Sequence, residues 1–464
     1  MSARPEQEAD LRLPSRPALV AAAAVLALTS CGSGTQSGGS ITLTITANSI
    51  EGGKNSESAA WIKKWVIPEF EKTHQNVKVL FQGNGVDDEQ YKTKIALDLK
   101  SKTGADVIDL DGIWVGEFAQ AGYVKPLTEV GGAGVEQWEG WSQIPQAVQG
   151  LGIFDGKKYG LPQGTDGRVL FYNKTLFKKA GLPETWQPES WQQIIDAGTK
   201  LKASGVPTPI QINAGTAMGE ATTMQGVLPL LAGAGSEVYS AGKWAGASQA
   251  VKDVLAFYQQ IYGGSGLGDP KLQQEAKGRD KSFAQFAAGK IAILAESDYF
   301  WRSVIEPKAG VAPMPDRDQV VGYAKIPARQ PGGGIRGQNF VSMSGGAVRV
   351  LNPFSKNPKL AWELLAFMHS AAATKSQLAG QARISSRTDV NEEVLTADPM
   401  LKYVADEVLP ITAYRPGLAV YPQVSTALQE ATAAVVSGKS ADEAAAAYQG
   451  KLEGLVGGAA NVGG

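Results

Sequence analysis

The sequence predicts an α/β protein with two lobes, each built on its own sheet. Its 464 residues are too many for a single hydrophobic core and suit two domains of ordinary size. A hydrophobic content of 43% and a charged content of 19% are typical of a globular protein. Beyond residue 40, apolar runs with a period of two alternate with helical runs. This order predicts a mostly parallel sheet with helices on its faces.

The elements of the first sheet are predicted from the pattern between residues 41 and 113. Residues 41–47 (ITLTITA) alternate aliphatic and threonine side chains, which predicts a strand. In 58–74 the apolar residues recur three and four apart, which predicts a helix. Its candidate N-caps are Ser56 and Ser58, and Pro68 is expected to kink it. A second strand at 77–83, a second helix at 89–101 and a third strand within 105–113 complete this unit.

From Phe154 onward the pattern changes, and a second α/β lobe is predicted to begin. Residues 154–162 (FDGKKYGLP) predict a hairpin, and 168–174 (RVLFYNK) predict a strand that leads into a helix. The other predicted elements are a helix within 185–205 with Pro188 at an early position, a helix at 280–288, a buried strand at 290–296, an irregular piece at 307–337, a helix within 357–370 capped by Asn357, and two helices within 424–455.

The start of the chain has the layout of an export signal. Three arginines precede an uncharged run over 18–28, which is too short to span a bilayer, since a spanning helix takes about 20 residues. Residues 28–31 (LTSC) then resemble the lipobox of bacterial lipoproteins, in which a diacylglycerol is attached to the cysteine, here Cys31. We expect a signal peptide over 1–31, a flexible tether over 32–40 and anchoring at the extracytoplasmic face of the cell membrane. The simpler alternative is a plain secretory signal with an incidental cysteine.

Charge and composition exclude several classes of function. A net charge of −1 gives no long-range attraction to nucleic acid. One cysteine and two histidines leave little material for a metal site, so we expect no metal and no cofactor. His74 and His369 both fall on predicted amphipathic helices and are expected at the surface, which argues against a Ser/His/Asp triad.

Two further motifs carry little functional information. Residues 332–337 (GGGIRG) have the spelling of a dinucleotide fingerprint, but Pro331 precedes them and a strand-like segment follows, so a loop is the better interpretation. The pairs Asp87/Asp88 and Asp109/Asp111 supply the two carboxylates that glycoside hydrolysis requires. Near a strand end, however, such residues more often cap a helix or accept hydrogen bonds from sugar hydroxyls.

Taken in order, several segments resemble the extracellular solute-binding proteins of carbohydrate ABC importers, the family 1 proteins that include the maltose-binding protein. The resemblance covers Ile41 to about Leu455. The segments that carry it are 65–79 (WVIPEFEKTHQNVKV), 104–129 (GADVIDLDGIWVGEFAQAGYVKPLTE), 156–186, 190–201, 283–301 (FAQFAAGKIAILAESDYFW), 357–370 (NPKLAWELLAFMHS) and 421–445.

The resemblance implies a two-lobed periplasmic-binding-protein-like fold, with a hinge and a ligand cleft between the lobes. Lobe 1 is expected to comprise 41–162 and 305–372, and lobe 2 to comprise 163–304 and 373–464. The chain is expected to cross between them near 160–165, 301–308 and 371–375. Such hinges absorb a closing motion when a ligand bridges the lobes, and the permease reads that closure.

The resemblance also implies candidate ligand-binding residues. A sugar offers apolar faces to aromatic rings and hydroxyls to carboxylates, amides and guanidinium groups. The family places cleft residues after the third strand, here Asp111 and Trp114. It places an acidic residue at the first crossing, here Asp166, with Arg168 beside it. Core packing is the alternative for Trp114, and a turn cap is the alternative for Asp166.

The strand at 290–296 supplies a second group of candidates. In "AESDYFW" the family often has Gly and Trp where this chain has Ser297 and Tyr299, so Tyr299 is the expected stacking ring. Asp298 is a candidate acceptor for sugar hydroxyls, and Trp301 is expected in the core. The remaining candidates are Glu51, Arg336, Gln338, Asn339, Arg383, Arg415 and Tyr421.

The function implied by the resemblance is reversible capture of a mono- or oligosaccharide by a monomeric lipoprotein, which delivers it to two permease subunits in the membrane. No catalysis is expected. One alternative is a protein of the same fold that binds another solute, such as a polyol phosphate or a peptide, because four arginines among the candidates would suit an anion. The other alternative is a secreted carbohydrate-active enzyme.

Overall fold

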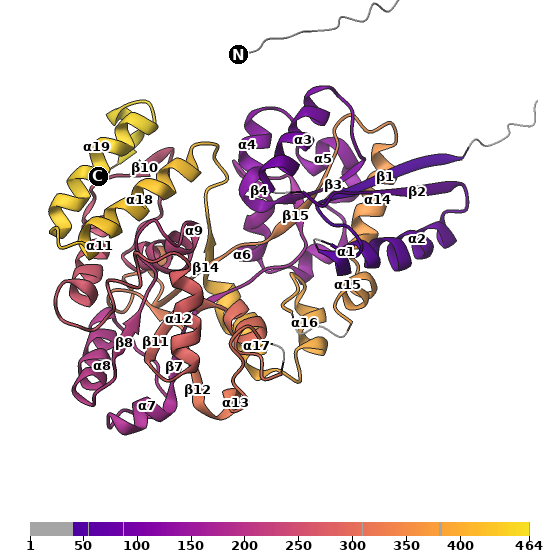
Figure 1. Ribbon diagram of the computed structural model, residues 1–464. Helices are drawn as coiled ribbons and strands as arrows, with labels where there is room; N and C mark the ends of the chain where they lie inside the picture. Colours follow the sequence, from indigo (N-terminus) through magenta and orange to yellow (C-terminus); the bar gives the residue numbers. More distant parts are fainter. Residues whose placement is uncertain (1–39, 54, 87, 309, 380–382, 464) are drawn as a thin grey trace, which may run out of the picture. The chain divides into compact units, whose positions relative to one another are not determined.

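The computed structural model describes most of the chain as a mixed α/β structure with two main sheets (Figure 1). The expected signal peptide with Cys31, and the tether up to residue 39, lie outside the described residues. In the described part of the chain no helix is long and apolar enough to cross a membrane. The described residues are 40–53, 55–86, 88–308, 310–379 and 383–463.

The first sheet has five strands and confirms the predicted parallel unit. Its order is β2 (Val77–Gly83), β1 (Ile41–Ala47), β3 (Val107–Asp111), β15 (Ala347–Leu351) and β6 (Gly160–Pro162). Strand β1 runs parallel to both β2 and β3, as the alternation of strands and helices in the sequence predicts. Strand β15 joins from much later in the chain and is antiparallel to β3 and β6.

Helices cover both faces of the first sheet. Leu43 and Ile45 of β1 are buried in a core that contains one set of helices, whereas Ile108 and Leu110 of β3 are buried in a second core. The first core includes α1 (Ser56–Trp61), α2 (Ile67–Thr73) and α14 (Pro358–Met368), and the second includes α3 (Asp88–Lys100) and α4 (Val115–Gln120). Shorter helices are α5 (Leu127–Gly131), α6 (Gln146–Gln149), α15 (Ala371–Gln377) and α16 (Thr388–Val394).

The helix predicted over 58–74 is interrupted by a π turn at Ile62–Val66. The turn comes directly before Pro68, which has no N–H to donate, so the irregularity expected at this proline takes the form of a wider turn. The prediction that Ser56 or Ser58 caps the helix is wrong. The cap position is Asn55, in a left-handed conformation with no side-chain cap, and the Ser56 hydroxyl instead accepts a hydrogen bond from an earlier backbone N–H.

The second sheet has four strands in the order β12 (Val321–Ala324), β7 (Arg168–Asn173), β11 (Ile291–Ser297) and β8 (Thr208–Gln211). Strand β7 is antiparallel to β12 and β11, and β11 is parallel to β8. Strand β12 therefore pairs with β7, although it comes from the 305–372 segment that we expect in the first lobe.

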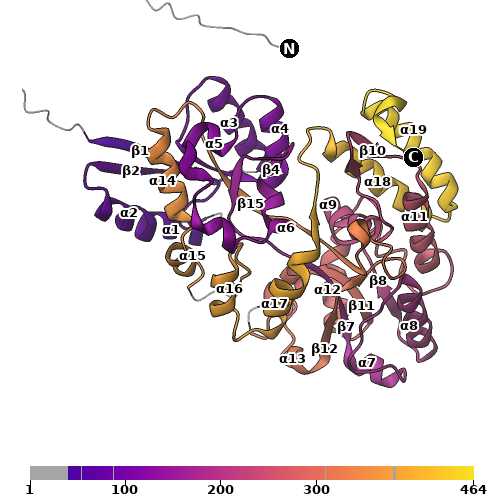
Figure 2. The same cartoon turned by 180° about the vertical axis from the view of Figure 1, so that it is seen from behind.

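Helices also cover both faces of the second sheet. Leu170 and Tyr172 of β7 belong to one core, and Val169 and Phe171 belong to another, as expected for alternating side chains on a strand. The first core contains α8 (Trp191–Ala203), α10 (Leu228–Gly233), α11 (Gln249–Tyr262), α18 (Tyr421–Val436) and α19 (Ala441–Leu455), with α18 and α19 beside α11 (Figure 2). The second contains α12 (Gly278–Ala287) and α17 (Pro399–Tyr403), and the short helices α7 (Lys174–Lys179), α9 (Glu220–Thr222) and α13 (Arg317–Val320) complete this part.

Several local predictions from residue 153 onward are confirmed and one is wrong. The hairpin forms between β4 (Ile153–Phe154) and β5 (Lys157–Lys158), with positive φ at Asp155 and Gly156 of its two-residue turn. The GGGIRG segment is a loop that leads into β14. Helix α8 begins at Trp191 with Ser190 as its cap, so the early position predicted for Pro188 is wrong.

Small sheets are formed by β13 (Ile326–Pro327), β14 (Phe340–Ser344) and β16 (Thr412–Tyr414), and by β9 (Tyr239–Ser240), β10 (Lys243–Ala245) and β17 (Val462–Gly463).

A buried charge cluster lies beneath the end of β3. The Arg349 guanidinium is 1% exposed and donates a 2.9 Å hydrogen bond to Asp109, its direct partner across the strands. The His369 Nε2 atom lies 3.3 Å from Arg349 Nη1, and His369 is 3% exposed. The prediction that His369 lies at the surface is therefore wrong. His369 follows α14 and is buried against Arg349 of β15, and sequence periodicity does not reveal that β15 packs on α14.

The burial of His369 predicts a specific pH dependence of stability. Burial, reinforced by the charges of Arg349 and Arg387, holds the pKa of His369 well below its usual value of about 6.5. Below that pH the unfolded chain binds a proton that the folded chain does not. The free energy of unfolding should therefore fall as pH falls from 6.5 to 5, at up to about 1.4 kcal/mol per pH unit. His369→Gln, which keeps an acceptor beside Arg349, should flatten this slope in urea unfolding measurements.

The matched control for this measurement is His74→Gln, at the other histidine, which lies outside the cluster and should keep the parental slope. Equal slopes for His369→Gln and the parent would contradict the assignment of the pH dependence to His369.

Candidate functional site

A cavity of about 710 Å³ lies at the carboxyl ends of β1 and β3. In open α/β sheets this is the edge at which ligands bind. Its walls come from the loop after β1, the end of β3, the segment between β6 and β7, the turn between β14 and β15, the π turn after β11, and the region of α15 and residues 383–385. The lining side chains that carry polar or aromatic groups include Asn48, Ser49, Asp88, Tyr91, Asp109, Asp111, Trp114, Gln163, Asp166, Arg302 and Arg383.

Two aspartates of the cavity stand where strands end. Asp111 is the last residue of β3 and accepts a 3.1 Å hydrogen bond from the Ile113 N–H, which fixes the start of a short 3₁₀ turn. Its side chain is nevertheless 46% exposed. Asp166 lies between β6 and β7, and its side chain is 27% exposed. The structure thus brings together these two carboxylates from segments that are 55 residues apart.

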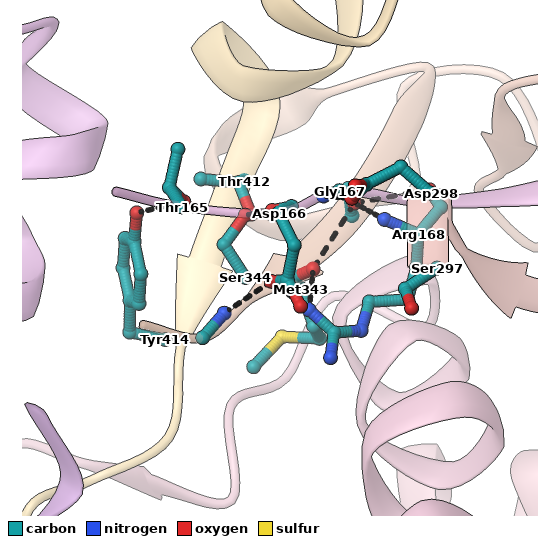
Figure 3. A network of polar contacts seen from close by, with 12 residues as sticks. Thr165, Asp166, Gly167, Arg168, Ser297, Asp298, Met343, Ser344, Thr412 and Tyr414 are labelled. Atoms are coloured by element: carbon teal, nitrogen blue, oxygen red, sulfur yellow. Dashed lines mark hydrogen bonds and ion pairs between the residues drawn. The ribbon is translucent and has the colours of Figure 1, made fainter. Parts of the chain in front are cut away.

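The Asp166 carboxylate also joins the segment between β6 and β7 to the turn between β14 and β15 (Figure 3). Its Oδ1 atom accepts a 2.7 Å hydrogen bond from the Gly345 N–H and pairs with the buried Arg168 guanidinium. Arg168 also donates to Gln225 at 3.0 Å and to the Met343 carbonyl at 3.2 Å. Among the described residues, the side-chain hydrogen bonds of Asp166 all go to Oδ1, and the residue lines the cavity.

Asp298 directly follows β11, extends this network, and is 1% exposed. It accepts a 3.0 Å hydrogen bond from the Gly167 N–H and a 3.0 Å hydrogen bond from Arg302 Nε. Burial and the nearby charge of Asp166 raise the pKa of Asp298, and Arg302 opposes them. Asp298 therefore orients Arg302, which lines the cavity, and does not line it itself.

A third group of charges surrounds Arg415, which follows β16. Its Nη1 atom lies 3.2 Å from Glu220, and its Nη2 atom lies 4.0 Å from Asp111. The Tyr421 hydroxyl donates a 2.7 Å hydrogen bond to the same Glu220. Burial alone would lower the pKa of Arg415, but Tyr421, Glu220 and Asp111 raise it. Arg415 thus stays charged and links the end of β3 to α9.

Arg383 differs from Arg302 of the same cavity because it has no ion-pair partner among the described residues. It lines the cavity, is exposed to solvent there, and forms no hydrogen bond or ion pair with any residue in the described ranges. Desolvation and the nearby Arg302 lower the pKa of Arg383, whereas Asp298 and Glu57 raise it. Arg302 pairs with Asp298 at 3.0 Å, so among the described lining residues Arg383 is the guanidinium group without an ion-pair partner.

Aromatic rings contribute less open surface than the sequence suggests. Trp114 lines the cavity but is only 9% exposed, with its ring 6.5 Å from that of Tyr91 and with Lys92 Nζ 6.0 Å from its centroid. Tyr299 does not line the cavity, and the Arg279 and Arg302 guanidinium groups lie 5.9 and 5.5 Å from its ring. Trp301 is buried in the core, as predicted.

The candidate residues named from the sequence divide into three groups. Asp111, Trp114, Asp166 and Arg383 line the cavity, and Arg168, Asp298, Arg415 and Tyr421 belong to the networks behind or beside it. The rest lie elsewhere: Glu51 pairs with Lys63, Arg336 donates to the Thr412 carbonyl, Asn339 accepts from the Gly332 N–H, and Gln338 and Tyr299 are outside the lining.

Sequence reasoning missed three residues that shape the site. Glu220 accepts hydrogen bonds from Tyr421 and Ser425 and pairs with Arg415, but it follows a segment without clear periodicity. Arg302 had a signal, because it lies four residues after Asp298 and pairs with it at 3.0 Å. Gln163 directly precedes the crossing and could have been found from its neighbours Gly164 to Asp166.

Sequence comparison finds short similarities to known binding proteins. A protein of Brucella abortus described as a binding protein is 31% identical over 112 residues, which are 24% of this chain and 26% of that protein. The sn-glycerol-3-phosphate-binding periplasmic protein of Brucella abortus is 34% identical over 87 residues, or 19% of this chain and 20% of that protein. The chain thus spans about a quarter or less of the length of these curated relatives.

Structure comparison extends the likeness to almost the whole chain. The sugar-binding protein MalE of Xanthomonas citri gives a TM-score of 0.72 at 17% identity, covering 89% of this chain and 97% of that one. The cyclic α-maltosyl-1,6-maltose binding protein of Arthrobacter globiformis gives 0.70 at 18% identity, covering 90% and 99%. A solute-binding protein of Thermotoga lettingae bound with α-D-tagatose gives 0.64 at 24% identity, covering 90% and 100%.

These likenesses confirm the predicted fold class, the two-lobed fold of periplasmic binding proteins. The family model for bacterial extracellular solute-binding proteins matches residues 53–375, which is more than half of the chain and includes most of the cavity wall. The protein therefore belongs to the bacterial extracellular solute-binding protein family that serves ABC importers.

Proposed function

We propose that this protein captures a sugar or a related polyol in the 710 Å³ cavity and delivers it to the permease of an ABC importer, without catalysis. The observation that carries the proposal is the convergence of Asp111 and Asp166, from two different segments, on one cavity. Carboxylates form strong charge-assisted hydrogen bonds with hydroxyl groups. Structures of similar fold are described as binding maltose-type sugars, tagatose and ribitol, which supports a polyhydroxylated ligand.

The arrangement of the sheets supports a binding role that depends on closure. We propose a lobe around the five-stranded sheet and a lobe around the four-stranded sheet, with β12 in the second. The segments at 163–167 and 345–346 would act as hinges, because the first connects β6 to β7 and the second connects β14, which packs on β7, to β15. Ligand contacts to Asp111 on one sheet and to Asp166 and Arg302 beside the other would favour the closed state, since a ligand shifts the equilibrium by its differential affinity.

The first prediction concerns the carboxylates. In a thermal-shift screen of the chain carrying Cys31→Ala, at least one mono-, di- or oligosaccharide should raise the melting temperature, by the equivalent of about 2.7 kcal/mol at a hundred times its Kd. Asp111→Asn should weaken binding of that sugar by about tenfold or more, because a hydrogen bond to a charged group contributes roughly 1.5–3 kcal/mol.

Asp166→Asn, which retains an acceptor for the Gly345 N–H, should have a similar effect on binding while the protein stays folded. The matched control is Asp406→Asn, at an exposed ion pair with Lys402. A sugar that binds both cavity variants as tightly as the parent would place the ligand elsewhere. Release of a chemically altered sugar would instead indicate an enzyme.

A second candidate ligand is a polyol phosphate, and the observation that favours it is Arg383, which lines the cavity without an ion-pair partner among the described residues. Such a guanidinium attracts a phosphate and suits bidentate binding of its oxygens. One relative, 34% identical over part of the chain, is named as binding sn-glycerol 3-phosphate.

Under this candidate, sn-glycerol 3-phosphate should stabilise the protein against thermal unfolding, and glycerol at the same concentration should not. Arg383→Gln should remove most of the stabilisation, whereas Arg317→Gln, at an arginine outside the cavity, should not. If sn-glycerol 3-phosphate has no effect and a neutral sugar stabilises the protein, the polyol phosphate is excluded.

We also propose that the protein is a lipoprotein anchored through Cys31 and acts as a monomer. The support is the arginine-led apolar run and the lipobox-like LTSC sequence, together with an extracellular family. When the gene is expressed in a bacterium fed with labelled fatty acid, the protein should take up label and stay with the membrane. Cys31→Ala should abolish both, and membrane retention of an unlabelled Cys31→Ala protein would contradict lipid anchoring.

A further inference from the structure

A second cavity, of about 630 Å³, shares no lining residue with the solute cavity. Its walls come from β4 and the turn that follows it, from α10 and the loop after that helix, and from residues 413–418, which begin in β16. It is therefore built by parts of the chain that pack on both main sheets. The solute-capture function proposed above uses none of its walls except Arg415, which lies beside both spaces.

The walls of this second cavity combine aromatic and aliphatic side chains with polar ones. Rings are supplied by Phe154, Tyr239 and Tyr414, all of which keep part of their surface exposed. Partly exposed rings that line a cavity can contact a ligand, and an aromatic face attracts cations because its π-system carries a negative potential. The aliphatic part of the wall includes Ile153, Leu228, Val238 and Leu418.

Two carboxylates at this cavity have no ionic partner. Asp155 lies in the β4–β5 turn and Glu237 lies between α10 and β9, and both are exposed. Neither forms an ion pair with any residue in the part of the chain that the structure describes. The lysines that follow Asp155 are engaged elsewhere, since Lys157 pairs with Glu129 and Lys158 with Glu136.

The one cation in the lining does not neutralise these carboxylates. Arg415 is 3.2 Å from Glu220 and 4.0 Å from Asp111, so its charge is already compensated by two other acids. The cavity therefore combines aromatic faces, aliphatic walls and two uncompensated negative charges. The two acids would repel an anion. They would attract a cation, whereas a neutral apolar molecule would gain no electrostatic attraction from them.

We propose that this second cavity binds a small organic cation with an apolar body, of the substituted-ammonium class. The ammonium group would lie against the ring faces, with Asp155 and Glu237 supplying long-range attraction, and the body would contact the aliphatic wall. This is the mode by which aromatic cages recognise quaternary ammonium groups. Arg415 lines this cavity and lies 4.0 Å from Asp111 of the other cavity, so a bound cation would alter the electrostatic environment of Asp111.

The experiment is calorimetric titration of the full chain carrying Cys31→Ala with benzyltrimethylammonium chloride and with choline chloride at low ionic strength. Saturable binding is expected for at least one of them. The uncharged isostere of choline, 3,3-dimethylbutan-1-ol, should not bind measurably. Titration with sodium chloride at equal ionic strength should give no saturable heat. Asp166→Asn should retain binding of the cation, which separates failure of this proposal from failure of the sugar proposal.

Three variants test the assigned walls. Glu237→Gln and Asp155→Asn, which tolerates the positive φ of the turn, should each raise the Kd of the cation by about fivefold or more. Phe154→Leu, which keeps an apolar side chain but removes the ring face, should do the same. The matched control is Glu189→Gln, at an exposed acid outside the cavity, which should leave Kd unchanged.

Several results would overturn the proposal. One is the absence of binding by both cations up to millimolar concentration. Another is equal binding of the uncharged isostere, which would show an apolar site without charge recognition. The last is a Kd that is unchanged in Glu237→Gln and Phe154→Leu, both verified as folded by circular dichroism, which would place the cation elsewhere on the protein.

Discussion

The Asp166 carboxylate is the constraint on which the candidate site depends. A single oxygen of this side chain accepts from the Gly345 N–H and pairs with Arg168, so the segments 163–167 and 345–346 meet at one atom. Arg168 is buried, and a buried guanidinium left unpaired would be strongly destabilising. The network therefore fixes the segment between β6 and β7 against the turn between β14 and β15, beside the cavity that Asp166 lines.

The charges around the cavity fall into compensated and uncompensated groups. Arg415, Glu220 and Asp111 balance one another, and Asp298 balances Arg302. Compensated groups are held in place before a ligand arrives, which lowers the ordering cost of binding. Arg383 stands apart because it lines the cavity without an ion-pair partner among the described residues. The cavity therefore offers both carboxylates that suit hydroxyl groups and an unpaired guanidinium that suits an anion.

The buried pair of Arg349 and Asp109 explains how a late strand finds its place in the first sheet. These residues are direct cross-strand partners although they are 240 positions apart in the chain. A shift of β15 by one residue would move Arg349 to the opposite face and leave Asp109 buried without a partner, at a cost of several kcal/mol. The pair therefore specifies register, and the register places the turn before β15 against the solute cavity.

The sequence by itself determined many local elements and named four residues that line the candidate cavity, and the tertiary structure decided the rest. Strands β1 to β3, helix α3, the β4–β5 hairpin and the C-terminal helices follow from periodicity and turn residues, which act between neighbours in the chain. The candidates Asp111 and Asp166 could be named because the resemblance to solute-binding proteins places cleft residues at the end of the third strand and at the first crossing. The pairing of β12 and β15, the burial of His369, and the partnership of Glu220 with Arg415 could not, since each depends on contacts between distant segments. Side-chain periodicity carries no information about which distant charge a residue will meet, and only packing settles that.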